Sequence, residues 1–118
     1  MTTVGTAVVT GAGTGVGKAV ATTLVKAGWN VVFVGRRANL LDEAATESGG
    51  GERAMAHACD ITNEAEVDAL FEAAVKRYGR VDLLFNNAGM GYKSTLIDEI
   101  PVSVWNDVVA VNLTGSFL

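Results

Sequence analysis

Short apolar runs alternate with stretches of helical spacing along this chain of 118 residues. The runs lie at 6–10, 29–35, 53–59 and 81–87, and they contain the uninterrupted apolar segments VVFV and LLF. Uninterrupted apolar strands are typical of a parallel sheet that is covered on both faces. The pattern therefore predicts four strands of such a sheet.

The clearest helical spacing lies at 64–78, between the third and fourth strands. Asn63 and Glu66 resemble a capping box at its start, and Gly79 is a typical stop. The apolar stripe recurs at i, i+3, i+4, i+7, i+8 and i+11. It consists of Val67, Leu70, Phe71, Ala74, Val75 and Tyr78.

Three further helices are predicted, one after each remaining strand. The first spans 16–27 and stops at Gly28, the second spans 38–48, and the last spans 102–117 after Pro101. For the first, the predicted apolar stripe is Val16, Val20, Leu24 and Ala27. Because strand and helix alternate four times without a linker, we expect one α/β domain over 1–118: a doubly wound parallel sheet between two layers of helices.

Composition narrows the choice of partners. A net charge of −4 and an isoelectric point near 4.8 argue against a nucleic-acid groove or an anionic membrane surface. No apolar run reaches the roughly 18 residues of a spanning helix. The single Cys59 cannot form an internal disulfide, so we expect a reducing, cytoplasmic setting. His57 is the only histidine, and no cluster of histidine, cysteine and carboxylate residues has the spacing of metal ligands, so we expect no metal site.

A glycine-rich segment, TGAGTGVG at 10–17, stands between the first strand and the first helix. In a doubly wound sheet this turn offers backbone N–H groups and the positive end of a helix to a dinucleotide diphosphate, and side chains would block that approach. The alternative is a turn that is rich in glycine only because it packs tightly. The predicted cofactor-binding residues here are Gly11, Gly13, Thr14, Gly15, Val16 and Gly17.

The tip of the second strand indicates which dinucleotide is bound. It reads VGRR, with Gly35 where an acid would contact a free ribose hydroxyl, followed by Arg36 and Arg37. Guanidinium groups bind phosphate with paired hydrogen bonds, so this tip favours NADP(H) over NAD(H). The alternative is a pair of solvated charges, although cations oppose the dipole at the start of a helix.

Four motifs in order resemble the short-chain dehydrogenase/reductase family: TGAGTGVG at 10–17, CDIT at 59–62, NNAG at 86–89 and VNLTGSF at 111–117. The resemblance implies a Rossmann-like fold with strand order 3-2-1-4. It also implies that Asp60 and Ile61 contact the adenine, and that a catalytic Asn112 holds a water of the proton relay. Three residues after the fourth strand would line the cofactor: Asn87, Ala88 and Gly89.

The family's acid/base pair, Tyr-x-x-x-Lys, does not occur in this sequence, because Asp82 follows Tyr78 and Leu96 follows Tyr92 at that spacing. We therefore expect the amino-terminal half of an NADP(H)-dependent short-chain oxidoreductase that is inactive by itself. By resemblance, the whole enzyme would act on a small carbonyl or alcohol and form a homodimer or homotetramer. The alternatives are a non-catalytic dinucleotide-binding module completed by a partner, and a nucleotide-sugar epimerase, which the glycine spacing disfavours.

Overall fold

The computed structural model describes residues 5–86, 101–103 and 106, and its elements follow the predicted alternation. Predicted and observed bounds agree within two residues over the sheet and the first three helices; most of the predicted helix at 102–117 lies outside the described residues. The elements are β1 (Thr6–Thr10), α1 (Gly15–Lys26), β2 (Asn30–Gly35), α2 (Ala38–Glu47), the 3-10 turn η1 (Gly51–Arg53), β3 (Ala54–Ala58), α3 (Glu64–Tyr78) and β4 (Leu83–Phe85).

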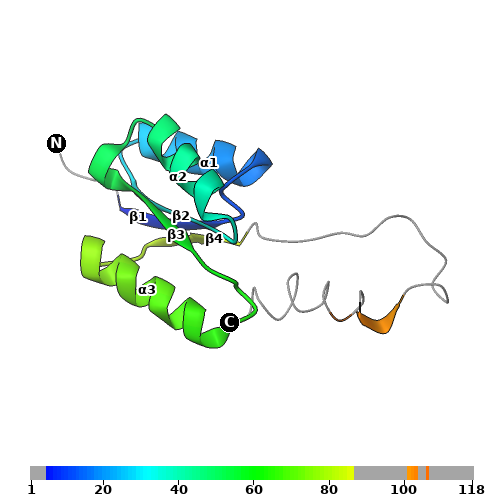
Figure 1. The fold of residues 1–118 in the computed structure, drawn as a ribbon. Coiled ribbons are helices and arrows are strands. Elements are labelled where there is room, and N and C mark those ends of the chain that lie inside the picture. Colours follow the sequence, from blue (N-terminus) through cyan, green and yellow to red (C-terminus); the bar gives the residue numbers. More distant parts are fainter. Residues whose placement is uncertain (1–4, 87–100, 104–105, 107–118) are drawn as a thin grey trace.

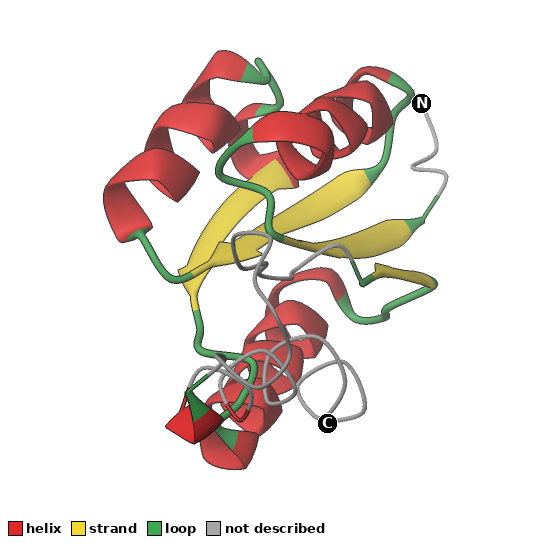
Figure 2. Ribbon diagram, turned by 90° about the vertical axis from the view of Figure 1, so that its right-hand side faces the viewer, coloured by secondary structure: helices red, strands yellow, loops and turns green. Residues whose placement is uncertain are grey.

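The four strands form one parallel sheet in the order β3-β2-β1-β4, which confirms the predicted order. In its register Val8 of β1 pairs with Val32 on one side and with Leu84 on the other. The sheet lies between two helical layers: α1 and α2 cover one face and α3 the other (Figures 1 and 2). The carboxyl ends of the parallel strands therefore meet at one edge of the sheet.

Alternate residues of the strands form two cores, one on each face of the sheet. Val9, Val31 and Phe33 pack with α1 and α2, whereas Val8, Val32 and Val34 pack with α3. Alternation follows from the pleat, which sends successive side chains to opposite faces. Because both faces are covered, the centres of β1 and β2 are apolar on both faces, as the uninterrupted VVFV segment predicted, and the buried Thr6 and Thr10 stand only at the ends of β1.

The buried face of α1 differs from the predicted stripe. The structure buries Gly17, Ala21 and Val25, whereas Val16 is 66% exposed and Ala27 is exposed. The prediction was wrong for Val16 and Ala27, whereas Val20 and Leu24 are half-buried and Leu24 packs against the core. The smaller residues occupy the side of the helix that meets the sheet, where a helix can approach closely only if its side chains are small.

Helix α3 begins and ends as predicted. The Asn63 side chain accepts from the Glu66 N–H at 3.1 Å, and Gly79 adopts a left-handed φ of 82° at the carboxyl end. The Glu66 carboxylate accepts from the Asp60 N–H at 3.3 Å, which differs from the reciprocal bond of a capping box. Of the predicted stripe, Val75 is 49% exposed and is not among the residues that pack in the core under α3.

Strand β4 lies at one edge of the described sheet, as expected for order 3-2-1-4. Leu83 and Leu84 are 39% and 43% exposed there. None of the helices in the described part of the chain is both long enough and apolar enough to cross a membrane.

Candidate functional site

The glycine-rich loop leaves β1 at the carboxyl edge of the sheet and turns directly into α1. Gly11 and Gly15 adopt left-handed φ values of 64° and 58°, which a side chain would strain. The Ala12 N–H donates to the Val34 carbonyl at 3.0 Å and ties the loop to β2. The loop therefore has a fixed shape, and two of its glycines are required by that shape alone.

The first turn of α1 has no side-chain cap. Thr14 occupies the N-cap position without capping the helix, and no acidic residue lies in the first turn. Helix α3 contrasts with it, because Asn63 caps that helix and Glu64 and Glu66 occupy its first turn. The first N–H groups of a helix lack intrahelical partners and carry partial positive charge. The start of α1 is therefore a place where an anion from outside the chain could bind.

The glycines of the loop differ in what surrounds them. A Cβ placed on Gly15 would meet nothing within 4 Å, whereas one on Gly13 would lie 3.2 Å from Leu40 Cβ. Gly13 therefore allows the loop to pack against the start of α2. Gly15 instead borders open space, which a ligand could approach. Val16, next to it, is largely exposed on the same turn.

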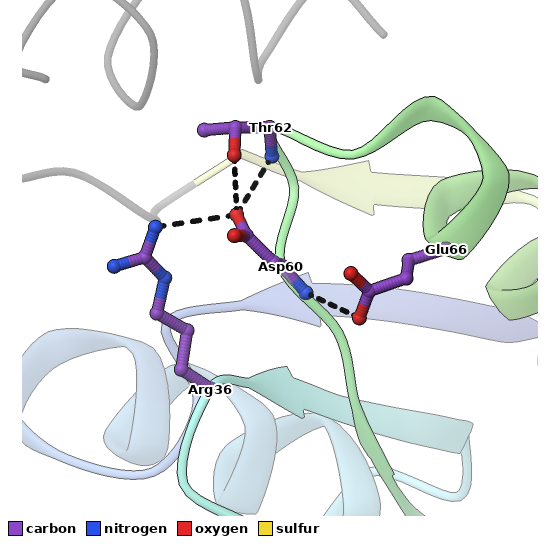
Figure 3. Close-up of polar contacts among 4 residues, drawn as sticks. All are labelled: Arg36, Asp60, Thr62 and Glu66. Carbon is purple, nitrogen blue, oxygen red and sulfur yellow. Dashed lines mark hydrogen bonds and ion pairs between the residues drawn. The ribbon is translucent and has the colours of Figure 1, made fainter.

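The tip of β2 brings Arg36 to the site. Arg36 and Arg37 are both exposed, and the Arg36 Nη2 donates to Asp60 Oδ1 at 3.2 Å (Figure 3). The side chains of this ion pair are 62% and 37% exposed. Sequence reasoning assigned the two residues to separate parts of a ligand and missed their contact, since they lie 24 positions apart in the sequence.

Asp60 is the most highly connected side chain of the site. Its Oδ1 accepts from the Thr62 hydroxyl at 2.6 Å and from the Thr62 N–H at 3.0 Å, as well as from Arg36 (Figure 3). These bonds stabilise the charged form, so they hold the pKa of the Asp60 carboxyl below its ordinary value; Thr62 contributes most and Arg36 less. Asp60 is therefore an ionised acceptor at neutral pH.

A cavity of about 360 Å³ opens beside this ion pair. Its walls come from the tip of β2, the end of β3 and the first turn of α3: Arg36, Ala58, Cys59, Asp60 and Glu66. Cys59 is buried, and burial raises the pKa of its thiol, with smaller contributions from Glu66 and Asp60. A thiol with a raised pKa is a poor nucleophile at neutral pH.

The structure thus gathers most of the predicted site at one edge of the sheet. The loop at 11–17, the arginines at 36–37 and Asp60 all follow the carboxyl ends of strands, and Ile61 is half-buried against the core under α3. Within residues 5–86, no cluster of three or more histidine, cysteine or carboxylate side chains could hold a metal ion. Four predicted site residues lie outside the described residues: Asn87, Ala88, Gly89 and Asn112.

Known proteins resemble this chain in both sequence and structure. The sequence profile of the short chain dehydrogenases matches residues 5–118. D-beta-hydroxybutyrate dehydrogenase of Rhizobium meliloti (strain 1021) is 38% identical over 117 residues, which cover 95% of this chain and 44% of that protein. Dehydrogenase/reductase SDR family member 1 of Mus musculus is 39% identical over 119 residues, or 94% of this chain and 38% of that protein.

Two solved structures extend the comparison. A 3-ketoacyl-(acyl-carrier-protein) reductase from Brucella melitensis, complexed with NADH, superimposes with a TM-score of 0.94 at 39% identity. The superimposed region covers 98% of this chain and 47% of the chain of the reductase. A variant of actinorhodin polyketide ketoreductase with NADPH gives a TM-score of 0.89 at 39% identity, over 95% of this chain and 43% of its own. The chain spans less than half the length of these relatives.

Proposed function

The chain belongs to the short-chain dehydrogenase family of NAD(P)-binding oxidoreductases, and from this premise we propose that it is the cofactor-binding half of an enzyme that transfers hydride between NADP(H) and a carbonyl or alcohol substrate. One observation carries the proposal most directly. The uncapped start of α1, the open side of Gly15, and the Arg36–Asp60 pair lie at one edge of the sheet. That edge is where doubly wound sheets bind dinucleotides.

In this proposal the backbone of residues 11–17 binds the diphosphate. The N–H groups of the first turn of α1 donate to its oxygens, and the Thr14 hydroxyl, which does not cap the helix, supplies a further donor. The exposed Val16 would contact the cofactor, whose nicotinamide would supply the hydride chemistry. Gly11, Gly13 and Gly17 give the loop its shape and its close packing.

The adenosine end is assigned to the tip of β2 and the segment after β3. Arg36 and Arg37 would bind a ribose 2′-phosphate, which favours NADP(H) over NAD(H). Asp60 would accept from the adenine amino group, with Ile61 beside it. The related structures include one with NADH and one with NADPH, so the choice rests on the arginines of this chain.

The remaining assignments follow the family resemblance. Asn87, Ala88 and Gly89 would line the cofactor, and Asn112 would hold the relay water. The whole protein would take a small-molecule carbonyl or alcohol, and it would assemble as a homodimer or homotetramer in the cytoplasm.

Replacing Gly15 with alanine tests the diphosphate site. Gly15 has a φ of 58° and open space around its missing Cβ, so Gly15→Ala is expected to lower the free energy of unfolding by about 1–2 kcal/mol. The new methyl group would also stand where the diphosphate approaches, and the dissociation constant for NADPH should rise about tenfold. Urea unfolding and isothermal titration calorimetry measure the two effects on the protein expressed from its complete reading frame.

Gly79→Ala is the matched control. Gly79 has a φ of 82° and the same empty surroundings, but it ends α3 and lies outside the site. This variant should lose similar stability and bind NADPH as the wild type does. Equal affinity losses in the two variants would reject the diphosphate role of Gly15, and a wild type that binds neither NADPH nor NADH would reject the proposed function.

A further inference from the structure

Building on the proposed function, we propose that Thr62 is a positioning residue for adenine recognition. By bonding to one oxygen of the Asp60 carboxylate, Thr62 reserves the other oxygen for the amino group of the base. Thr62 itself touches no cofactor in this arrangement. It acts by fixing which carboxylate oxygen the cavity presents.

The hydrogen bonds divide the two oxygens of Asp60 unequally. Oδ1 accepts three donors: the Thr62 hydroxyl at 2.6 Å, the Thr62 N–H at 3.0 Å and Arg36 Nη2 at 3.2 Å. A carboxylate oxygen offers about two lone-pair sites, so Oδ1 is saturated. Among the described residues no donor bonds to Oδ2, and Figure 3 shows all three contacts converging on the same oxygen.

The anchoring by Thr62 also restricts rotation of the carboxylate. The terminal torsion of an aspartate is broad and nearly two-fold, so a carboxylate without an anchor exchanges its oxygens readily. The backbone of Asp60 is held as well: its N–H donates to Glu66 Oε1 at 3.3 Å and its carbonyl accepts from the Asn63 N–H at 3.0 Å. Thr62 therefore adds the last constraint to a residue whose main chain is already fixed.

The charge on Asp60 determines whether it recognises a hydrogen-bond donor or an acceptor on a base. The Thr62 bonds favour the ionised carboxylate, which can accept hydrogen bonds but cannot donate one. Asp60 lines the cavity together with Ala58 and Cys59. Because its carboxylate only accepts hydrogen bonds, it favours a purine whose amino group can donate to it, and it disfavours a purine with a carbonyl oxygen at the same position. The site should therefore distinguish adenine from hypoxanthine, and this preference should depend on Thr62.

The test compares Thr62→Val, which keeps the shape and the backbone N–H but loses the hydroxyl, with Thr62→Ser, which keeps the hydroxyl. The probes are NADPH and its analogue with hypoxanthine in place of adenine, titrated by calorimetry into the protein expressed from its complete reading frame. Thr62→Val should weaken NADPH binding about fivefold and leave the analogue nearly unchanged. Thr62→Ser should bind both as the wild type does.

Thr23→Val is the matched control, because it removes a threonine hydroxyl that is bonded to the Ala19 carbonyl at 2.9 Å in the second half of α1, away from the cavity. It should change neither affinity. As a second measurement, NMR titration of the Asp60 carboxyl should show a higher pKa in Thr62→Val than in the wild type.

The outcomes separate the two proposals. If the wild type binds NADPH and the hypoxanthine analogue, and Thr62→Val weakens the binding of both equally, Thr62 has only a structural role in its turn. The inference is then overturned, while the proposed function stands. If Thr62→Val leaves the Asp60 pKa and the preference for adenine unchanged, the inference is also overturned. A wild type that binds neither NADPH nor NADH overturns the proposed function, and the inference with it.

Discussion

Arg36→Ala should weaken the binding of NADPH about 30-fold and change that of NADH no more than about twofold. A guanidinium bound to a phosphate contributes charge-assisted hydrogen bonds of about 1.5–3 kcal/mol, and NADH has no phosphate at that position. Arg36 is mostly exposed and its pair with Asp60 lies at the surface, so its removal should cost little stability. The affinity loss is therefore a direct effect on the ligand.

Two further variants sharpen this comparison. Lys76→Ala removes one exposed positive charge from the last turn of α3, away from the site, and should affect neither cofactor. Arg36→Lys keeps the charge but not the paired hydrogen bonds, so it should recover only part of the NADPH affinity. Equal weakening of NADPH and NADH by Arg36→Ala would remove the 2′-phosphate role.

Phe33→Ala should lower the free energy of unfolding by about 3–5 kcal/mol. Phe33 is fully buried in the middle of β2 and belongs to the core beneath α1 and α2. The truncation would leave a cavity between β2 and the helices α1 and α2. Because Arg36 directly follows β2, we expect the position of Arg36 in the cofactor site to become less well fixed as well. Urea unfolding followed by circular dichroism measures the change in free energy.

Phe71→Ala supplies the comparison for this measurement. Phe71 is only half-buried and packs against the margin of the opposite core. The same chemical truncation should therefore cost markedly less there. A larger loss at Phe71 than at Phe33 would show that the face of the sheet under α1 and α2 does not dominate the stability.

The fold could be predicted from the sequence because its signals are local. Strands covered on both faces are apolar over most of their length, and the caps of α3 are encoded by Asn63 and Gly79 themselves. The buried face of α1 could not be predicted in the same way. That face is set by how closely the helix approaches the sheet. The small residues Gly17 and Ala21 are therefore buried against the sheet, whereas the more hydrophobic Val16 is exposed.

In the candidate site, too, the features with a local sequence signal could be predicted, whereas the contacts between distant residues could not. The spacing of the glycines located the loop, and the arginines after β2 located the charged tip. The Arg36–Asp60 contact depends on side-chain geometry across two strands, which no local pattern contains. The bond from the Thr62 N–H to Asp60 did have a local signal, since an aspartate side chain often accepts from the backbone N–H two positions further on.

The most direct test of the central claim follows the backbone amides of residues 15–17 by two-dimensional NMR as NADPH is added. If the first turn of α1 binds the diphosphate, the resonances of Gly15, Val16 and Gly17 should show the largest shifts and saturate together with the binding isotherm. The amides of the last turn of α3, which lie away from the site, should change little. Saturation with NADPH that leaves the three α1 amides unmoved would contradict the account.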